Sequence, residues 1–341
     1  MGLTAQQKAI LSRAAQPKAP RKKGSQSDVA LHPGRHKFEE LIKGFIADQD
    51  IAPSSRRTYR SAMEQFVTWY LSWHSLHPAD NPTRETILQY KEWLDQKGLQ
   101  PFTRANYLVA VRRFFEWAEG KKLHPNIAKG IKGSRRVIKA HQKSALTIEQ
   151  VQYLLGSIDQ STLNGKRDFA LVNLLCRTGL RLIEVKRAVI GDMEQQANGT
   201  ALLWIRGKGR DGKDDFVLLT AEALEPIACY LAARGSPRLD QPLFASVSDR
   251  NQGRQLTTFS LSRLIKCRLR AAGLGNKRVT AHSLRHTFGV LAITAGASLY
   301  EVQLAMRHTS PSTTEMYLGD IERQKRLEGG PEKLITKLFK K

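Results

Sequence analysis

The chain has 341 residues, of which 41% are hydrophobic and 25% are charged, and this balance excludes a wholly disordered protein. Its 55 lysines and arginines outnumber its 31 acidic residues, which leaves a net charge of +24. A surface this basic attracts polyanions and favours DNA binding, in which cations neutralise phosphates. A ribosome or a membrane surface is the alternative partner. No membrane partner is expected, because the sequence has no 18-residue apolar run and no long basic amphipathic helix.

The cysteines and the N-terminus indicate a cytoplasmic protein. Cys176, Cys229 and Cys267 are far apart in sequence, which fits neither a disulfide framework nor the spacing of metal ligands. We therefore expect reduced thiols. The N-terminus is polar and lacks the apolar segment of a secretion signal. No glycine-rich phosphate-binding motif is present, so we expect neither ATP nor another cofactor.

The first third of the chain predicts a basic arm followed by a helical domain. Residues 1–36 carry seven lysines and arginines and one acid, which predicts a flexible arm. Over residues 37–120 apolar side chains recur at helical spacing, and we predict four helices, namely Phe38–Ala47, a helix from Ser54 through Tyr70, Thr83–Gln96 and Phe102–Glu119. Arginines recur on two of these helices, which favours a DNA-binding face over a merely solvated one. The candidates are Arg56, Arg57, Arg60, Arg104, Arg112 and Arg113.

A basic linker separates this domain from a mixed α and β domain. Residues 121–144 contain lysines, arginines and glycines but no acid, which predicts an interdomain linker. Residues 145–328 are predicted to form the second domain, which opens on a capping box at Thr147. Two strands, Ala201–Arg206 and Asp215–Leu219, flank a glycine-rich hairpin loop. The other predicted elements are the helices Arg167–Cys176, Ala221–Arg234, Thr257–Ala272, Ala281–Ala295, Leu299–Met306 and Ser310–Tyr317. The fold class is thus mainly α with a small β-sheet (α+β).

The last segment, residues 329–341, is predicted to be a short amphipathic helix. Its apolar side chains are Leu334, Ile335, Leu338 and Phe339. The helix either docks on a neighbouring protomer or packs on its own domain, and the sequence leaves both open.

Two arginines are candidates for binding a phosphate that is being cleaved. Cleavage of a phosphodiester without a metal needs fixed cations that meet the charge of the transition state. Arg181 and Arg285 fit, because a guanidinium binds phosphate bidentately and stays protonated. His282 lies three residues before Arg285, so the two share a helix face. His286 is expected to turn away and to be structural.

A metal-dependent nuclease is disfavoured. Such an enzyme needs clustered carboxylates, and residues 250–300 contain nine lysines and arginines but no aspartate or glutamate. A zinc pair of His282 and His286 lacks a glutamate between them, and Arg285 would repel the ion. We therefore predict no metal site.

Tyr317 is the candidate nucleophile. A free phenol has a pKa of about 10, and surrounding cations stabilise the phenolate. His282 is the candidate general base. A core tyrosine is the alternative, although a polar rather than an apolar segment precedes Tyr317. Lys208, in the hairpin loop, is the candidate acid for the leaving oxygen, with Lys213 and Arg210 as rivals and a solvated turn lysine as the alternative.

Several motifs together resemble the tyrosine recombinase (phage integrase) family. They are Thr178-Gly-Leu-Arg181-x-x-Glu184, Gly207-Lys208-Gly, His282-Ser-Leu-Arg285-His-Thr-Phe, His308 and Tyr317. The resemblance is strong over residues 145–320 and weaker over 37–120. It implies that Arg181, Lys208, His282, Arg285 and His308 surround the scissile phosphate, that Tyr317 attacks it to form a 3′-phosphotyrosine, and that Glu184 supports Arg181. One departure is Met306-Arg307 before His308, where the family usually has Leu-Gly.

The resemblance also implies a partner and an assembly. A helical core-binding domain and a catalytic domain would form a C-shaped clamp on double-stranded DNA. Four protomers would recombine two sites through a Holliday junction, with or without accessory DNA-binding factors. The outcome would be integration or excision of a mobile element, or resolution of DNA multimers. The alternatives are a type IB-like topoisomerase and a non-catalytic DNA-binding protein. The helical N-terminal half and the apolar tail favour a recombinase, and the complete set of candidate residues speaks against lost catalysis.

Overall fold

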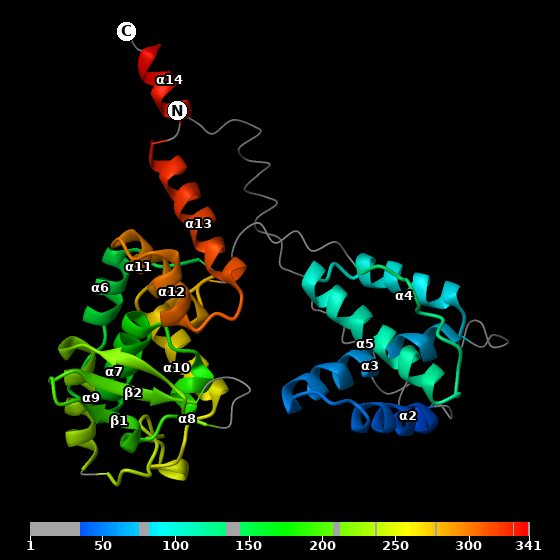
Figure 1. The fold of residues 1–341 in the computed structure, drawn as a ribbon, viewed down its shortest axis with the longest axis horizontal. Helices are drawn as coiled ribbons and strands as arrows, with labels where there is room; N and C mark the ends of the chain where they lie inside the picture. Colours follow the sequence, from blue (N-terminus) through cyan, green and yellow to red (C-terminus); the bar gives the residue numbers. More distant parts are fainter. Residues whose placement is uncertain are drawn as a thin grey trace, which may run out of the picture. The chain divides into compact units, whose positions relative to one another are not determined.

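Helices make up most of both halves of the computed structural model, and one small sheet accompanies them, as the sequence predicts (Figure 1). The structure describes residues 35–74, 82–133, 144–206, 212–235, 237–276, 278–329 and 331–339. Most of the predicted basic arm, residues 134–143 of the predicted linker, and the loop residues Lys208 and Arg210 lie outside these ranges. The chain divides into two units, residues 1–137 and 138–341. Among the described residues no helix is long and apolar enough to cross a membrane.

The first unit contains the four predicted helices, which enclose an aromatic core. They are α2 (Arg35–Ala47), α3 (Pro53–His74), α4 (Arg84–Gln96) and α5 (Pro101–Gly120). Phe66 on α3 meets Tyr90 on α4 edge to face at a centroid distance of 5.0 Å, and Phe115 on α5 at 6.2 Å. Such contacts add to the free energy of burying the rings. They fix the helices that carry the candidate DNA-binding arginines.

The second unit is built around the buried helix α7 (Leu163–Thr178), which packs against α9 (Ala221–Arg234) and α11 (Ala281–Thr294). The helix begins four residues before the predicted start, because the Thr162 hydroxyl caps it by accepting from the Gly165 N–H at 3.0 Å. Its buried Asp168 binds Arg167 at 2.7 Å and Arg268 on α10 (Thr258–Ala271) at 2.6 Å. This ion-pair network ties α7 to α10 inside the core.

The sheet has three antiparallel strands in the order β1 (Met193–Gln195), β2 (Ala201–Ile205) and β3 (Asp215–Leu219). Leu203 pairs with Val217, and both are buried against the helical core. The prediction missed β1, because three residues are too few for an alternating pattern. The short helices α6 (Ile148–Gly156), opened by the predicted Thr147 capping box, and α8 (Leu182–Arg187) flank α7 in the chain.

The last helices of the second unit carry most of the predicted reactive residues. In this unit α11, α12 (Leu299–Met306) and α13 (Pro311–Gly329) pack on one another, and α14 (Pro331–Leu338) follows α13 (Figure 1). Helix α13 runs well past the predicted end at Tyr317. Residues 321–328 are mostly good helix formers, so propensity continues the helix beyond the turns that bury Thr314 and Tyr317.

Gly179 should be intolerant of a side chain. It ends α7 in the left-handed conformation (φ 60°), and an added Cβ would lie 2.5 Å from Phe288 Cδ1. Gly273 has a similar φ of 68° but open space around the Cβ position. Urea denaturation should show that Gly273→Ala costs about 1 kcal/mol of unfolding free energy from backbone strain alone. Gly179→Ala should cost a further ~1–3 kcal/mol from the clash. Equal losses in the two variants would contradict the packing at Gly179.

Candidate active site

Arg181 and Glu184 are joined by the start of helix α8. Arg181 is the residue before α8, and Glu184 at the third helical position reaches back to it. The Glu184 carboxylate accepts from the Arg181 backbone N–H at 2.7 Å and from its guanidinium at 2.9 Å. Because Glu184 is only 1% exposed, this arrangement holds an oriented guanidinium over a buried carboxylate.

Arg285 is buried on α11 and is held by two main-chain oxygens. Its guanidinium donates to the carbonyl of Gly179 and to the carbonyl of Met306. Burial and then the charge of Arg181 lower the pKa of Arg285 to about 9, while Glu184 opposes the shift. At that pKa the side chain remains a cation at neutral pH.

The turn that ends α12 brings both arginines together. Arg285 donates to the Met306 carbonyl, and Arg181 donates to the next carbonyl, that of Arg307, at 2.9 Å. His308 follows directly, and its Nδ1 lies 2.9 Å from the hydroxyl of buried Thr314. Three of the predicted residues therefore converge on one short turn. Two of the five N–H donors of each guanidinium serve this framework.

Tyr317 is buried beside two imidazole rings. Its ring centroid lies 4.9 Å from that of His286 and 6.1 Å from that of His308, with both pairs nearly stacked. The expectation that His286 turns away from the reactive residues is wrong, since its ring covers the predicted nucleophile. Gly289, one turn after His286, leaves space for the tyrosine, and an added Cβ there would lie 2.9 Å from Tyr317 Cζ.

His282 and the lysines are placed less centrally. His282 is exposed on the first turn of α11, whereas Arg285 one turn later is buried. Lys208 lies outside the described residues. Its rival Lys213 makes an ion pair with buried Asp192, which also accepts from the Val189 N–H at 2.9 Å. The pair anchors the end of the hairpin loop, so Lys213 has a structural task there.

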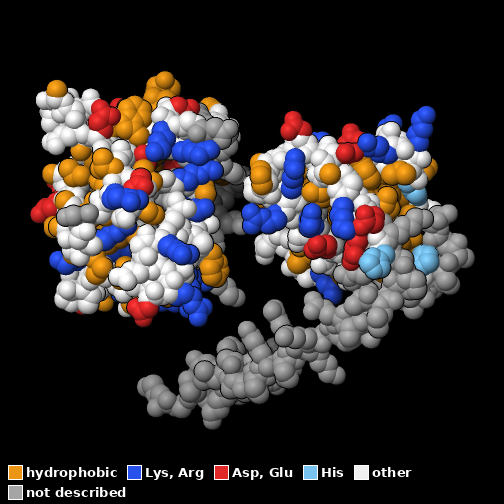
Figure 2. All heavy atoms as spheres, turned by 90° about the horizontal axis from the view of Figure 1, so that it is seen from below, with side chains coloured by type: hydrophobic (Ala, Val, Ile, Leu, Met, Phe, Trp, Pro, Cys, Tyr) orange, Lys and Arg blue, Asp and Glu red, His pale blue; other side chains and the backbone are white. Residues whose placement is uncertain are grey.

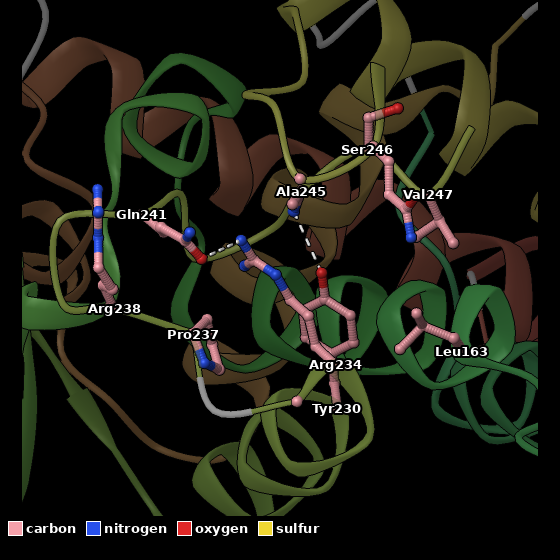
Figure 3. Close-up of a pocket in the computed structure, with 12 residues that line it drawn as sticks. Leu163, Tyr230, Arg234, Pro237, Arg238, Gln241, Ala245, Ser246 and Val247 are labelled. Atoms are coloured by element: carbon pink, nitrogen blue, oxygen red, sulfur yellow. Dashed lines mark hydrogen bonds between the residues drawn. The ribbon is translucent and has the colours of Figure 1, made fainter. Parts of the chain in front are cut away.

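One hollow of the second unit lies apart from the candidate site. A pocket of about 290 Å³ is lined by residues of α9 and the loop after it, with none of the predicted reactive residues (Figure 3). Its polar groups are bonded within the protein. Arg234 donates to Pro242 O at 2.6 Å, and the Tyr230 hydroxyl accepts from the Ala245 N–H at 3.2 Å. A wider hollow of about 700 Å³ instead reaches Arg307 and His308.

The candidate DNA-binding arginines of the first unit fall into two groups. Figure 2 shows Lys and Arg side chains on the displayed face of each unit. Five of the candidates are exposed, namely Arg56, Arg57 and Arg60 around a hollow with Lys43, and Arg112 and Arg113 near Glu116 and Glu119. Arg104 differs, because its guanidinium pairs with Asp95 and joins α5 to α4. The first three are therefore the strongest candidates for phosphate contact.

The site is rich in cations rather than in metal ligands. Within the described ranges no three His, Cys, Asp or Glu side chains gather as a metal site would require. Arg181, Arg285 and Arg307 share the single carboxylate of Glu184, which leaves an excess of positive charge. Such an arrangement fits an anion, and a phosphate in particular.

Comparisons with known proteins identify the family to which both units belong. Residues 144–322 match the family described as the phage integrase family, and residues 38–122 match the phage integrase N-terminal SAM-like domain. The tyrosine recombinase XerD of Vibrio cholerae serotype O1 is 26% identical over 288 residues, which cover 84% of this chain and 93% of that protein. Tyrosine recombinase Synpcc7942_B2651 of Synechococcus elongatus is 27% identical over 277 residues, 78% of this chain and 84% of that protein.

Solved structures share the fold. XerH recombinase in a post-cleavage complex with a palindromic difH substrate superposes with a TM-score of 0.68 at 22% identity, over 87% of this chain and 85% of that one. A lambda integrase tetramer bound to a Holliday junction gives a TM-score of 0.61 at 15% identity, over 83% of this chain and 76% of that one. The two alignments cover 87% and 83% of this chain and so extend over parts of both units.

Proposed function

We infer that this chain, which belongs to the phage integrase family, is a DNA cleaving and rejoining enzyme. We propose that its Tyr317 attacks a DNA phosphate that Arg181 and Arg285 hold. The observation that carries the proposal is the turn at residues 306–308. Its carbonyls accept hydrogen bonds from the guanidiniums of Arg181 and Arg285. The turn also carries His308, whose ring lies beside that of Tyr317. The nucleophile and the cations that a phosphodiester needs thus share one framework.

The proposed reaction is a pair of balanced transesterifications. The Tyr317 oxygen forms a bond to phosphorus and the bond to the 5′ oxygen breaks, which leaves a 3′-phosphotyrosine and a 5′ hydroxyl. The phenol proton passes to a base, for which His282 is the candidate, and Lys208 protonates the leaving oxygen. Arg181, Arg285 and His308 meet the negative charge on the non-bridging oxygens. A 5′ hydroxyl of another strand then reverses the step, so no ATP is consumed.

The proposed role is site-specific recombination of double-stranded DNA in the cytoplasm. The matched XerD and Synechococcus proteins are named tyrosine recombinases and align over most of their length. The chain would integrate or excise a mobile element or resolve DNA multimers. We propose that it does so as a tetramer, a state in which the lambda integrase has been solved on a Holliday junction.

Replacing the nucleophile should stop covalent trapping. On a nicked suicide substrate, Tyr317→Phe should give no protein–DNA adduct and should retain nearly full DNA binding, because only the attacking oxygen is lost. Tyr300→Phe is the matched control, since Tyr300 is 68% exposed on α12, and its adduct should form normally. An adduct with the Tyr317 variant would refute the assignment.

On the same substrate, Lys208→Ala should slow cleavage by about 10²- to 10⁴-fold. A 5′-bridging phosphorothiolate, whose leaving group needs no proton, should restore it.

The exposed arginines at the start of α3 should set the salt dependence of binding. A variant with Arg56, Arg57 and Arg60 all changed to Ala should bind every DNA sequence more weakly. Its slope of log affinity against log salt should be shallower by about 0.9 per lost phosphate contact. Arg238→Ala is the control, because this exposed guanidinium is paired with Asp240. An unchanged slope in the triple variant would show that these arginines do not contact DNA.

We propose that α14 docks on a neighbouring protomer. Its side chains Ile335, Leu338 and Phe339 are 49%, 72% and 83% exposed. The hollow beside the active site exposes apolar side chains of β3 and α12 that suit them, namely Phe216, Leu218 and Leu304. A chain ending at Gly329 should still form the covalent adduct but fail to sediment as a tetramer on DNA. Loss of stability with intact assembly would instead indicate packing on its own unit.

A further inference from the structure

Arg307 occupies a position where a side chain with a Cβ is strained. It ends α12 at φ 54°, in the left-handed region, whereas the other positive-φ residues of the second unit's described part are glycines. The family resemblance places a glycine at this position. An arginine there needs compensation from its contacts.

The Arg307 guanidinium is turned into the protein. Its side chain is 9% exposed, and it donates to Glu184 Oε2 at 2.9 Å and to the Ala305 carbonyl at 2.6 Å. Glu184 binds Arg181 through both oxygens, and the Arg181 guanidinium donates in turn to the Arg307 carbonyl. The hydrogen bonds of the Arg307 side chain and of its carbonyl thus form a closed loop through Glu184 and Arg181.

We propose that Arg307 is a positioning residue of the phosphate site, which fixes Arg181 through Glu184. The proposal rests on the proposed function, in that Arg181 contacts the scissile phosphate. Arg307 binds Glu184 Oε2, whereas the guanidinium of Arg181 binds Glu184 Oε1. With both oxygens held, the carboxylate cannot rotate away from Arg181. The contact also joins the His308 turn to α8, so the phosphate-binding groups on both elements keep one geometry.

The charge of Arg307 also keeps Glu184 ionised. Burial raises the pKa of Glu184, but the charge of Arg307 and the hydrogen bonds from Arg181 outweigh burial and bring the pKa below its ordinary value. The charged groups that face the carboxylate are Arg181, Arg307 and, from α11, Arg285. Without Arg307 the main opposition to burial is gone, so Glu184 should take up a proton as the pH falls.

Single-turnover cleavage of the suicide substrate tests the proposal. Arg307→Met, which keeps the length and loses the charge, should slow cleavage by about 10- to 100-fold with little change in DNA affinity. Arg307→Gly should be slowed as well, although it relieves the backbone strain. Arg307→Lys should recover part of the rate. Arg234→Met is the matched control, because it removes a half-buried hydrogen bond from a guanidinium to the Pro242 carbonyl outside the site. This variant should cleave normally.

Two further readouts separate positioning from a general structural effect. Glu184→Gln combined with Arg307→Met should be no slower than the slower single variant, because both act through one contact. The Arg307→Met rate, divided by the wild-type rate at the same pH, should also fall as the solution becomes more acidic, whereas the same ratio for the double variant should stay level.

The proposal is overturned if Arg307→Gly cleaves at the wild-type rate, or if the rate losses of Glu184→Gln and Arg307→Met multiply in the double variant. It is also overturned if the Arg307→Met rate, relative to wild type, does not fall as the pH is lowered. Circular dichroism and DNA binding check that each variant folds, and Arg307→Gly, being unstrained, keeps the test valid if Arg307→Met does not fold. Failure of the proposed function is separate, because it would appear as an adduct in Tyr317→Phe whatever Arg307 does.

Discussion

The proposed active site depends on two successive main-chain carbonyls. Arg285 and Arg181 donate to the oxygens of Met306 and Arg307, and these bonds decide where the two positive charges lie. A long flexible side chain loses entropy when it is fixed, so an unanchored arginine would bind a phosphate at a larger cost. Here the fold has already fixed the guanidiniums, and α11, α8 and α12 must all be in place for them to converge.

This dependence links stability to chemistry. The second carbonyl that Arg285 uses belongs to Gly179, which also ends α7, the central helix of the unit. The core packing of α7 therefore fixes the position of Arg285, a proposed phosphate-binding cation, as well as the fold. Tyr317 also links stability to chemistry. It packs in a small apolar cluster with Val290, Val302 and Met306 and is at the same time the proposed nucleophile. The alternatives of core residue and nucleophile are thus compatible.

Much of this was predictable from the sequence. The four N-terminal helices, the hairpin strands and the Thr147 cap follow from local patterns that the structure keeps. The residues Arg181, Arg285, His308 and Tyr317 were identified by motif, and the structure brings them together. What the sequence did not reveal depends on long-range contacts. The stacking of His286 on Tyr317 joins residues 31 positions apart, and the closed loop of hydrogen bonds among Arg307, Glu184 and Arg181 spans more than 120. No local pattern encodes such pairs.

The use of carbonyl oxygens has an evolutionary consequence. Every amino acid supplies the same main-chain acceptor, so the side chains at 306 and 307 are free to change while the arginines keep their anchors, provided that the left-handed backbone is tolerated. Position 307 can therefore hold a residue other than glycine without loss of the carbonyl anchor. The arginine there reaches Glu184, so a substitution that leaves both anchors in place still removes a contact of the carboxylate.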